Sequence, residues 1–251
     1  MLLPPILNWL KQVSHWLKKA ARIKSILVVL SLLGVGFGLL STLHAEEPGI
    51  VLPVPVIDNP KAAGTSQTAV LAGGCFWGVQ GVFEHVKGVQ KVLAGYAGGS
   101  KATAAYETVS SGGTGHAEAV QISFDPREVS YGEILRIYFS VAHDPTQLNR
   151  QGPDTGTQYR SEIFYNDDTQ KNIAQAYVAQ LDKARLLQGA IVTRIEPLKG
   201  FYAAEDYHQD FLVKNPRHPY IVFNDLPKIQ NLKRTYPDYY RAQPVTVDAI
   251  H

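Results

Sequence analysis

Alternating and helically spaced apolar residues follow one another from residue 68 onward and predict strands mixed with helices. The predicted order is strand 68–72, helix 75–87, strand 89–96, strand 116–124, helix 131–142, strand 158–166, helix 168–187, strand 190–196 and helix 203–213. The segment after Pro216 is expected to wrap the surface, with a short helix at 228–235. This order favours an α+β fold: a two-layer sandwich with a mixed β-sheet and packed helices, in a single domain over residues 68–251.

The first 45 residues have a different pattern, with basic residues before an apolar run. Five Lys and Arg residues and no acidic residue precede or accompany the apolar stretch 26–40, and Leu43-His44-Ala45 offers a small-residue cleavage point. The pattern predicts an N-terminal export signal or membrane anchor over 1–45. We favour cleavage, because the run is shorter than the ~20 residues of a stable transmembrane helix. The protein is then exported, to the periplasm or envelope of a Gram-negative bacterium. Residues 46–67, with four prolines, are expected to be a proline-rich linker.

The charge of the chain changes when this segment is set aside. The segment holds five of the 24 Lys and Arg residues and none of the 22 acidic residues, so the remainder carries a net charge of about −3. The basic balance therefore belongs to the export segment, and no nucleic-acid partner is expected. Contact with a membrane is expected only through residues 1–45 if they stay uncleaved.

A lone cysteine gives the chain its main candidate for chemistry. Cys75 stands in Gly73-Gly74-Cys75-Phe76-Trp77-Gly78 and is the only cysteine of 251 residues, so no disulfide can form within the chain. The glycines end the strand and a helix follows, which puts Cys75 in the first helical turn. Free N–H groups and the helix dipole favour a thiolate there and lower its pKa. The alternative is a small buried apolar residue, the commonest state of free cysteine.

A second candidate is an acidic residue on an apolar strand face. In the strand 116–124, Glu118 shares its face with Val120, Ile122 and Phe124. Burial would raise the pKa of this carboxyl and keep it protonated, as a general acid near neutral pH requires. A strand-end carboxylate that reaches solvent fits the same pattern equally well.

Around Cys75 the sequence resembles a known family, the type A peptide methionine sulfoxide reductases. The resemblance rests on Gly-Cys-Phe-Trp-Gly after a strand and on further blocks in family order over about residues 68–224. These blocks are Gly95-Tyr96-Ala97-Gly98-Gly99, Tyr106-Glu107, Gly115–Val120, His143-Asp144-Pro145, Asp154–Ser161 and Ala204–Gln209. The resemblance implies thiol-dependent reduction of methionine S-sulfoxide, peptide-bound or free, through a sulfenic acid on Cys75. Oxidised proteins are the implied substrates and protein repair is the implied function.

The resemblance also implies roles for individual residues. Glu118 becomes the acid, and Tyr106 and Tyr159 become hydrogen-bond donors to the sulfoxide oxygen. Phe76 and Trp77 form an aromatic pocket for the sulfoxide methyl group, and Asp154 makes a polar contact on the substrate side. Without the resemblance, the tyrosines could be ordinary core aromatics, and Phe76 and Trp77 could pack the helix onto the sheet.

No bound cofactor or metal is expected. The histidines fit no zinc spacing, and Gly112-Gly113-Thr114-Gly115 lacks the lysine of a phosphate loop. His208, inside one of the family blocks, is interpreted as structural support near the site. A monomer is expected.

One departure from the family affects the catalytic cycle. Many relatives carry further cysteines near the C-terminus, whereas residues 215–251 hold none. A sulfenic acid on Cys75 would therefore need an external thiol. Glutathione, thioredoxin or an exported thioredoxin-like protein are the candidate reductants.

Two other classes of function remain open from the residues alone. One is a different cysteine-dependent enzyme, a thiol peroxidase or an acyl-transfer hydrolase. The other is a non-catalytic envelope protein that binds methionine-rich segments in the aromatic pocket. Glu118 on an apolar face argues against the binding protein, and the lack of a Cys–His signature argues mildly against the hydrolase.

Overall fold

The computed structural model describes residues 49–59 and 66–247, which belong to one compact unit, Glu46–His251. The expected export signal or anchor over residues 1–45 lies outside the described residues. Within the described ranges, no helix is long and apolar enough to cross a membrane.

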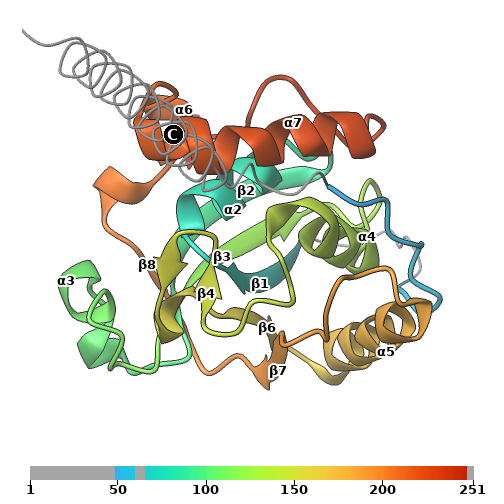
Figure 1. Cartoon of the computed structure of the whole chain (residues 1–251), viewed down its shortest axis with the longest axis horizontal. Coiled ribbons are helices and arrows are strands. Elements are labelled where there is room, and N and C mark those ends of the chain that lie inside the picture. The colour runs from blue at the N-terminus through green and yellow to red at the C-terminus, as the bar shows by residue number, and fades with distance from the viewer. Residues whose placement is uncertain (1–48, 60–65, 248–251) are drawn as a thin grey trace, which may run out of the picture. The chain divides into compact units, whose positions relative to one another are not determined.

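A mixed six-stranded sheet forms the centre of this unit (Figure 1). Its strands are β1 (Gln67–Gly73), β2 (Val89–Ala97), β3 (Ala117–Phe124), β6 (Ser161–Tyr165), β7 (Arg194–Pro197) and β8 (Phe201–Ala203). Their order across the sheet is β7-β6-β1-β3-β2-β8. Only β6 and β7 are paired parallel; the other neighbours are antiparallel. Two short strands, β4 (Arg150–Gln151) and β5 (Asp154–Thr155), form a separate ribbon.

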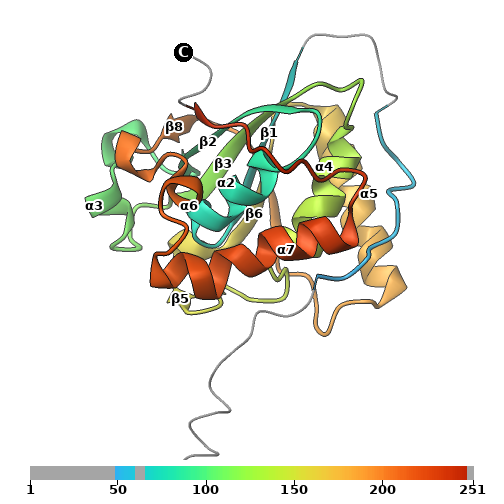
Figure 2. The ribbon, with the colours of Figure 1, turned by 90° about the horizontal axis from the view of Figure 1, so that it is seen from above.

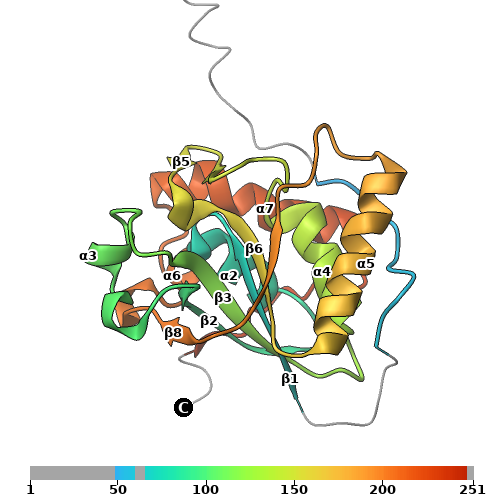
Figure 3. The ribbon, with the colours of Figure 1, turned by 90° about the horizontal axis from the view of Figure 1, so that it is seen from below.

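The helices lie around this sheet. They are α2 (Phe76–Glu84), α3 (Tyr106–Val109), α4 (Tyr131–Ile137), α5 (Asp168–Ala184), α6 (Phe211–Lys214) and α7 (Leu226–Thr235). Three 3-10 turns, η1 (Lys101–Thr103), η3 (Thr157–Tyr159) and η4 (Asp206–His208), and two π-helical segments, η2 (Tyr138–Ala142) and η5 (Ile221–Asp225), complete the described helical elements. Figure 2 shows α7 running along α2, and Figure 3 shows α4 and α5 side by side, away from α3. The predicted α+β architecture with a mixed sheet and packed helices is therefore confirmed.

Both faces of the sheet are buried, and side chains of β3 point alternately to one face and to the other. Val120, Ile122 and Phe124 face the main core, which also contains residues of α2 and α4. Ala117 and Ala119 face a smaller cluster on the other side, which Leu198 and Phe201 help to cover. Because side chains alternate along a strand, Glu118 lies on the main-core face, as its pattern predicted.

The predicted helix 203–213 is wrong. β8, η4 and α6 divide this stretch. The buried Gln209 side chain bonds both backbone groups of Ala94, with its Oε1 accepting from the N–H at 3.0 Å and its Nε2 donating to the carbonyl at 2.9 Å. Asp210 then takes a left-handed backbone conformation with φ +56°. These bonds tie the segment to β2, so it cannot continue as one helix.

The proline-rich segment differs from the expected linker. Leu52 is completely buried; its N–H donates to the Tyr236 hydroxyl at 3.2 Å and its carbonyl accepts from Arg136 Nε at 2.7 Å. The carbonyl of Pro53 accepts from the Tyr177 hydroxyl at 2.9 Å. Side chains of the domain thus satisfy the backbone of this extended stretch, so residues 49–59 are a strap on the domain surface rather than a free spacer.

Candidate active site

Cys75 is the N-cap residue of α2, at the point where the chain leaves β1. The turn depends on Gly74, whose φ of +89° is unfavourable for other residues. A Cβ at Gly74 would also lie 2.5 Å from the Gln151 side chain. Cys75 itself is only 8% exposed. The sequence motif therefore forms the expected strand–turn–helix, with the cysteine one position before the first helical turn.

The prediction of a lowered thiol pKa is wrong for the resting site. Burial raises the pKa of Cys75 well above its ordinary value, and the charges of Glu118, Asp225 and Asp154 raise it further. The hydrogen bond from the backbone N–H of Trp77 lowers the pKa, as expected at a helix start, but it is the weaker effect. Desolvation of the thiolate outweighs the helix terminus, so the free enzyme holds Cys75 as a thiol at neutral pH.

Glu118 lies on β3 beside the start of α2. Its side chain is 3% exposed, and Oε2 accepts a hydrogen bond from the backbone N–H of Phe76 at 3.0 Å. Burial raises the pKa of Glu118 to about 8; the Phe76 N–H opposes this shift, while Asp154 and Asp225 add to it. Glu118 is therefore mostly protonated at neutral pH. Its hydrogen-bond partner, the N–H of Phe76, belongs to the residue that directly follows Cys75. The solvent-reaching alternative is excluded.

Tyr106 and Tyr159 come from separate segments and meet near Cys75. Tyr106 begins α3, and Tyr159 ends η3. Burial raises the pKa of both phenols, and the charges of Glu118 and Cys75 contribute to both shifts. Both hydroxyls are thus neutral donors in the same electrostatic environment as the thiol and the acid. The structure brings these four side chains together.

Glu205 holds Tyr106 in place, and its position was not predicted. Its carboxylate accepts from the Tyr106 backbone N–H at 2.9 Å and from the Tyr96 hydroxyl at 2.9 Å. Tyr96 lies directly opposite Glu118 in the β2–β3 register. Glu205 therefore fastens α3 to the strand that faces the acid. Its only signal in the sequence is its membership of the block Ala204–Gln209.

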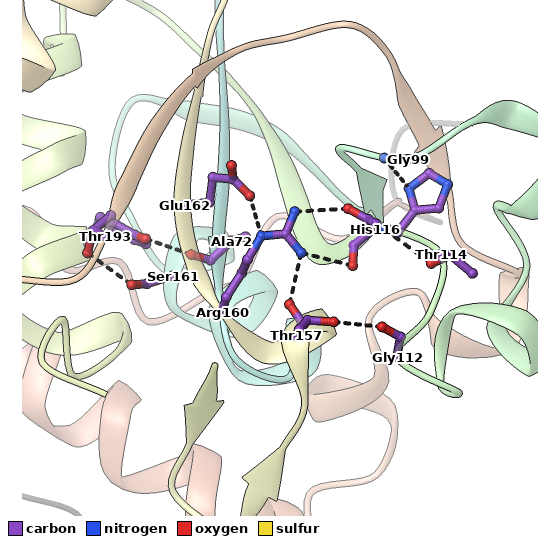
Figure 4. A network of polar contacts seen from close by, with 12 residues as sticks. Ala72, Gly99, Gly112, Thr114, His116, Thr157, Arg160, Ser161, Glu162 and Thr193 are labelled. Atoms are coloured by element: carbon purple, nitrogen blue, oxygen red, sulfur yellow. Dashed lines mark hydrogen bonds and ion pairs between the residues drawn. The ribbon is translucent and has the colours of Figure 1, made fainter. Parts of the chain in front are cut away.

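A buried arginine next to Tyr159 in the chain, Arg160, is the centre of a network of polar contacts (Figure 4). Arg160 donates from Nε to Glu162 at 2.6 Å, from Nη1 to the carbonyls of His116 at 3.1 Å and Thr157 at 2.8 Å, and from Nη2 to the Gly115 carbonyl at 3.0 Å. The guanidinium therefore joins η3 to the residues just before β3. Because Tyr159 precedes Arg160 and Glu118 follows His116 by two residues, this network joins the segment that carries the phenol to the segment that carries the acid.

The two aromatic residues after Cys75 have different surroundings. Phe76 is 1% exposed and lies against Tyr96 and His208, with ring centroids 5.9 and 5.0 Å away. Trp77 is partly exposed and stacks on Phe211 at 3.8 Å. Its indole N–H donates to His208 Nδ1 at 3.1 Å, so His208 supports the indole as expected. Phe76 thus packs the core beneath the site, while Trp77 reaches its surface.

Asp154 lies on the short strand β5 and is half-buried. Its Oδ2 accepts a hydrogen bond from the Tyr220 hydroxyl. Burial raises the pKa of Asp154, whereas the Tyr220 hydrogen bond and the Lys228 charge lower it. Tyr220 was not predicted, and no motif in the sequence marks it.

The C-terminal segment also brings a buried ion pair to α2. Asp225 and Lys228 are 0% and 4% exposed, and Lys228 Nζ lies 3.4 Å from Asp225 Oδ1. A Cβ at Gly78 would lie 2.1 Å from that oxygen, so glycine is required at this position of the helix. Burial raises the pKa of Asp225 to about 6 against the charge of Lys228. This segment, expected only to wrap the surface, thus contributes charges that act on Cys75.

Within residues 49–59 and 66–247, no group of three or more His, Cys, Asp or Glu side chains could hold a metal ion. The cluster instead combines a thiol, a protonated carboxyl and neutral phenols. Such a set can deliver a sulfur nucleophile and hydrogen-bond donors to a polar bond that breaks to leave negative charge on oxygen.

Comparison with known proteins identifies similar chains. The family model described as peptide methionine sulfoxide reductase matches residues 67–239. The chain is 64% identical over 189 residues to "Peptide methionine sulfoxide reductase MsrA 2" of Mesorhizobium japonicum, covering 75% of this chain and 97% of the relative. It is 53% identical over 197 residues to the protein of that name from Synechocystis sp., covering 77% and 92%.

Two solved structures share the fold. The reduced form of Mxr1 from Saccharomyces cerevisiae aligns with a TM-score of 0.55 and 35% identity over 62% of this chain and 90% of that one. Methionine sulfoxide reductase A of Corynebacterium diphtheriae aligns with a TM-score of 0.53 and 34% identity over 70% and 92%.

Proposed function

The chain belongs to the peptide methionine sulfoxide reductase family and reduces methionine S-sulfoxide to methionine, and from this premise we propose how its own residues carry the reaction. Cys75 is the nucleophile, Glu118 the acid, and Tyr106 and Tyr159 the hydrogen-bond donors to the sulfoxide oxygen. Trp77 and Phe76 contact the methyl side of the substrate, and Asp154 makes the polar contact. The observation that carries this assignment is the protonated, buried Glu118 held against the N–H next to Cys75.

In the first step, the Cys75 sulfur attacks the sulfoxide sulfur while the S–O bond breaks. Glu118 supplies a proton to the oxygen, and the thiol proton of Cys75 restores Glu118. The oxygen leaves as hydroxide, which then attacks the Cys75 sulfur; the bond between the two sulfurs breaks, so methionine leaves and Cys75 becomes a sulfenic acid. The sulfoxide is reduced by two electrons and Cys75 is oxidised by two. Because the pKa of Cys75 is raised, the thiol keeps its proton until substrate is bound. Protonation of the sulfoxide oxygen then withdraws electrons from the sulfoxide sulfur, and the thiol loses its proton as its sulfur attacks.

In the second step, an external thiol attacks Cys75-SOH, giving a mixed disulfide and water. A second thiol then releases Cys75 and leaves as the oxidised disulfide. The chain has one cysteine, so this step needs a thiol from another molecule. We propose a thioredoxin-like protein or glutathione as the reductant.

The cellular location belongs to the same proposal. The basic stretch, apolar run and small-residue site within residues 1–45 support export to a Gram-negative envelope. Repair of oxidised envelope proteins would then take place in an oxidising compartment, where a dedicated exported reductant fits better than free glutathione.

Single-turnover reduction tests the proposal. The purified full-length protein, reduced and freed of thiols, is mixed with excess methionine S-sulfoxide, and released methionine and the mass of the Cys75 peptide are followed. We expect about one methionine per chain and a 16-dalton gain at Cys75, the mass of one oxygen atom. A folded, reduced protein that releases no methionine but consumes peroxide would contradict the assignment and favour a thiol peroxidase.

A further inference from the structure

The C-terminal segment reaches into the site through one aromatic side chain. Tyr220 stands immediately before η5, and its ring lies edge-on to Trp77, with centroids 5.8 Å apart and planes at 84°. Its hydroxyl donates to Asp154 Oδ2 on β5. Tyr220 therefore contacts two of the proposed substrate-side residues, which lie 77 positions apart in the sequence.

The ring contact restrains Trp77. One face of the indole is stacked on Phe211, and the indole N–H is bonded to His208. The edge-on ring of Tyr220 adds a contact from a different segment. An edge-to-face pair is a favourable geometry for aromatic rings. Trp77 is therefore held by residues 208–220, although it belongs to α2.

The hydroxyl contact orients Asp154. A carboxylate on a two-residue strand has freedom to rotate unless a partner fixes it. The Tyr220 phenol binds one carboxylate oxygen of Asp154, Oδ2, and the other oxygen remains a potential acceptor. Hydrogen bonds to charged groups are stronger than neutral ones, so this contact restrains the side chain effectively.

We propose that Tyr220 is a positioning residue for substrate binding: its hydroxyl orients Asp154 and its ring holds Trp77. The C-terminal segment then completes the substrate side of the site and acts on binding rather than on sulfur chemistry. The inference rests on the proposed function of this site, since Asp154 and Trp77 are its substrate contacts.

Charged and titratable groups from several elements face Asp154. They are Lys228 of α7, Asp225 at the end of η5, Glu118 of β3, Tyr159 of η3, and Cys75. Lys228 favours the carboxylate, whereas the acidic neighbours oppose it. The Tyr220 hydrogen bond adds to the effect of Lys228, so its loss should raise the pKa of Asp154. As the pH is lowered, Asp154 of the variant would then become protonated at a higher pH than in the wild type, and substrate binding would weaken from that pH downward.

The test is Tyr220→Phe in the full-length protein, with steady-state reduction of methionine S-sulfoxide by dithiothreitol. We expect KM to rise about tenfold, in the range of a lost hydrogen bond to a charged group, and kcat to change less than about threefold. The acid limb of kcat/KM should also move to higher pH. The matched control is Tyr239→Phe, which removes another phenol–carboxylate contact, to Glu133, in a different part of the domain. Its KM should equal that of the wild type.

Two further measurements separate positioning from a general structural effect. In the Asp154→Asn background, Tyr220→Phe should add little to the loss, because its main partner is already changed. In an inactive Cys75→Ser background, calorimetric titration with methionine S-sulfoxide gives the Kd directly. Adding Tyr220→Phe to this background should raise Kd by the same factor as it raises KM in the active protein.

Several outcomes would overturn the inference. These are an unchanged KM in Tyr220→Phe, an equal rise in Tyr239→Phe, or full additivity with Asp154→Asn. A kcat loss with unchanged KM would do so too. If the wild type itself releases no methionine, the proposed function fails instead, so the two failures are distinguishable.

Discussion

The two ends of α2 each lie beside a buried carboxyl group, yet only one end forms a reactive site. At the N-terminal end, Glu118 is 3% exposed and its pKa is raised to about 8. At the C-terminal end, Glu84 is completely buried and its pKa is raised well above the ordinary value. In both cases burial is the largest cause. Burial is therefore the main reason why the pKa of an acid is raised at either end.

The neighbours of the two acids differ. Glu118 is bonded to the Phe76 N–H and lies with a thiol and two phenols, whereas Glu84 lies beside a second acid, Asp210. Asp210 in turn accepts from the Val247 N–H at 3.0 Å and pairs with Lys214 at 3.5 Å. The acid at the C-terminal end thus lies beside a structural cluster in which Asp210 binds the backbone of Val247. A buried acid with a raised pKa can take part in a reaction only where a nucleophile and hydrogen-bond donors lie next to it.

Removal of the nucleophile should have the largest effect. Cys75→Ser is expected to abolish methionine release, because serine is a poor nucleophile without an activating base. Rapid-quench assays of released methionine measure this directly. Substrate binding to the variant should persist, and any turnover above background would contradict the role of Cys75.

Replacement of the acid should have the next largest effect. Glu118→Gln keeps the shape and removes the transferable proton, so the single-turnover rate should fall about 10²–10⁴-fold while Kd changes little. The matched control is Glu84→Gln, which should retain the wild-type rate. Equal losses in the two variants would show that a buried acid at either end of α2 matters only for folding.

The pH dependence sharpens the same contrast. Because the pKa of Glu118 is about 8, the protonated acid is lost as the pH rises through that value. For wild type with excess substrate, the rate of the chemical step should fall by up to tenfold per pH unit above about 8. Glu118→Gln should lack this decline and remain slow throughout. A wild-type rate that keeps rising to pH 10 would argue against Glu118 as the acid.

The smallest effect is expected at the other end of the helix. Since the folded-state pKa of Glu84 is raised, its contribution to stability is fully present below about pH 4.5, the unfolded value, and is lost as the pH rises toward the folded value. This loss is at most about 1.4 kcal/mol per pH unit. Urea unfolding between pH 5 and 8 should therefore show a shallower decline for Glu84→Gln than for wild type. Parallel declines would show that Glu84 is not protonated in the native state.

Much of the site could be predicted from local pattern. The strand, the glycine pair and the helical spacing placed Cys75 at the start of α2, and period-two alternation placed Glu118 on the core face of β3. Those features depend on a few consecutive residues, because backbone periodicity sets which face a side chain takes. The family blocks then marked Tyr106, Tyr159 and Asp154, which the structure brings to the same cluster.

The protonation state of that cluster and its full set of residues depend on contacts between distant segments of the fold. The pKa of Cys75 is raised rather than lowered, because burial and three carboxylates from distant segments outweigh one helix terminus. Tyr220 and Glu205 reach the site through contacts 66 and 99 positions long, which no local pattern encodes. The sequence pattern predicted most of the elements and the main chemical groups; the fold set how far those groups are removed from water and which charges face them. The physical reason is that periodicity is local, whereas desolvation and Coulomb interactions depend on distances in space.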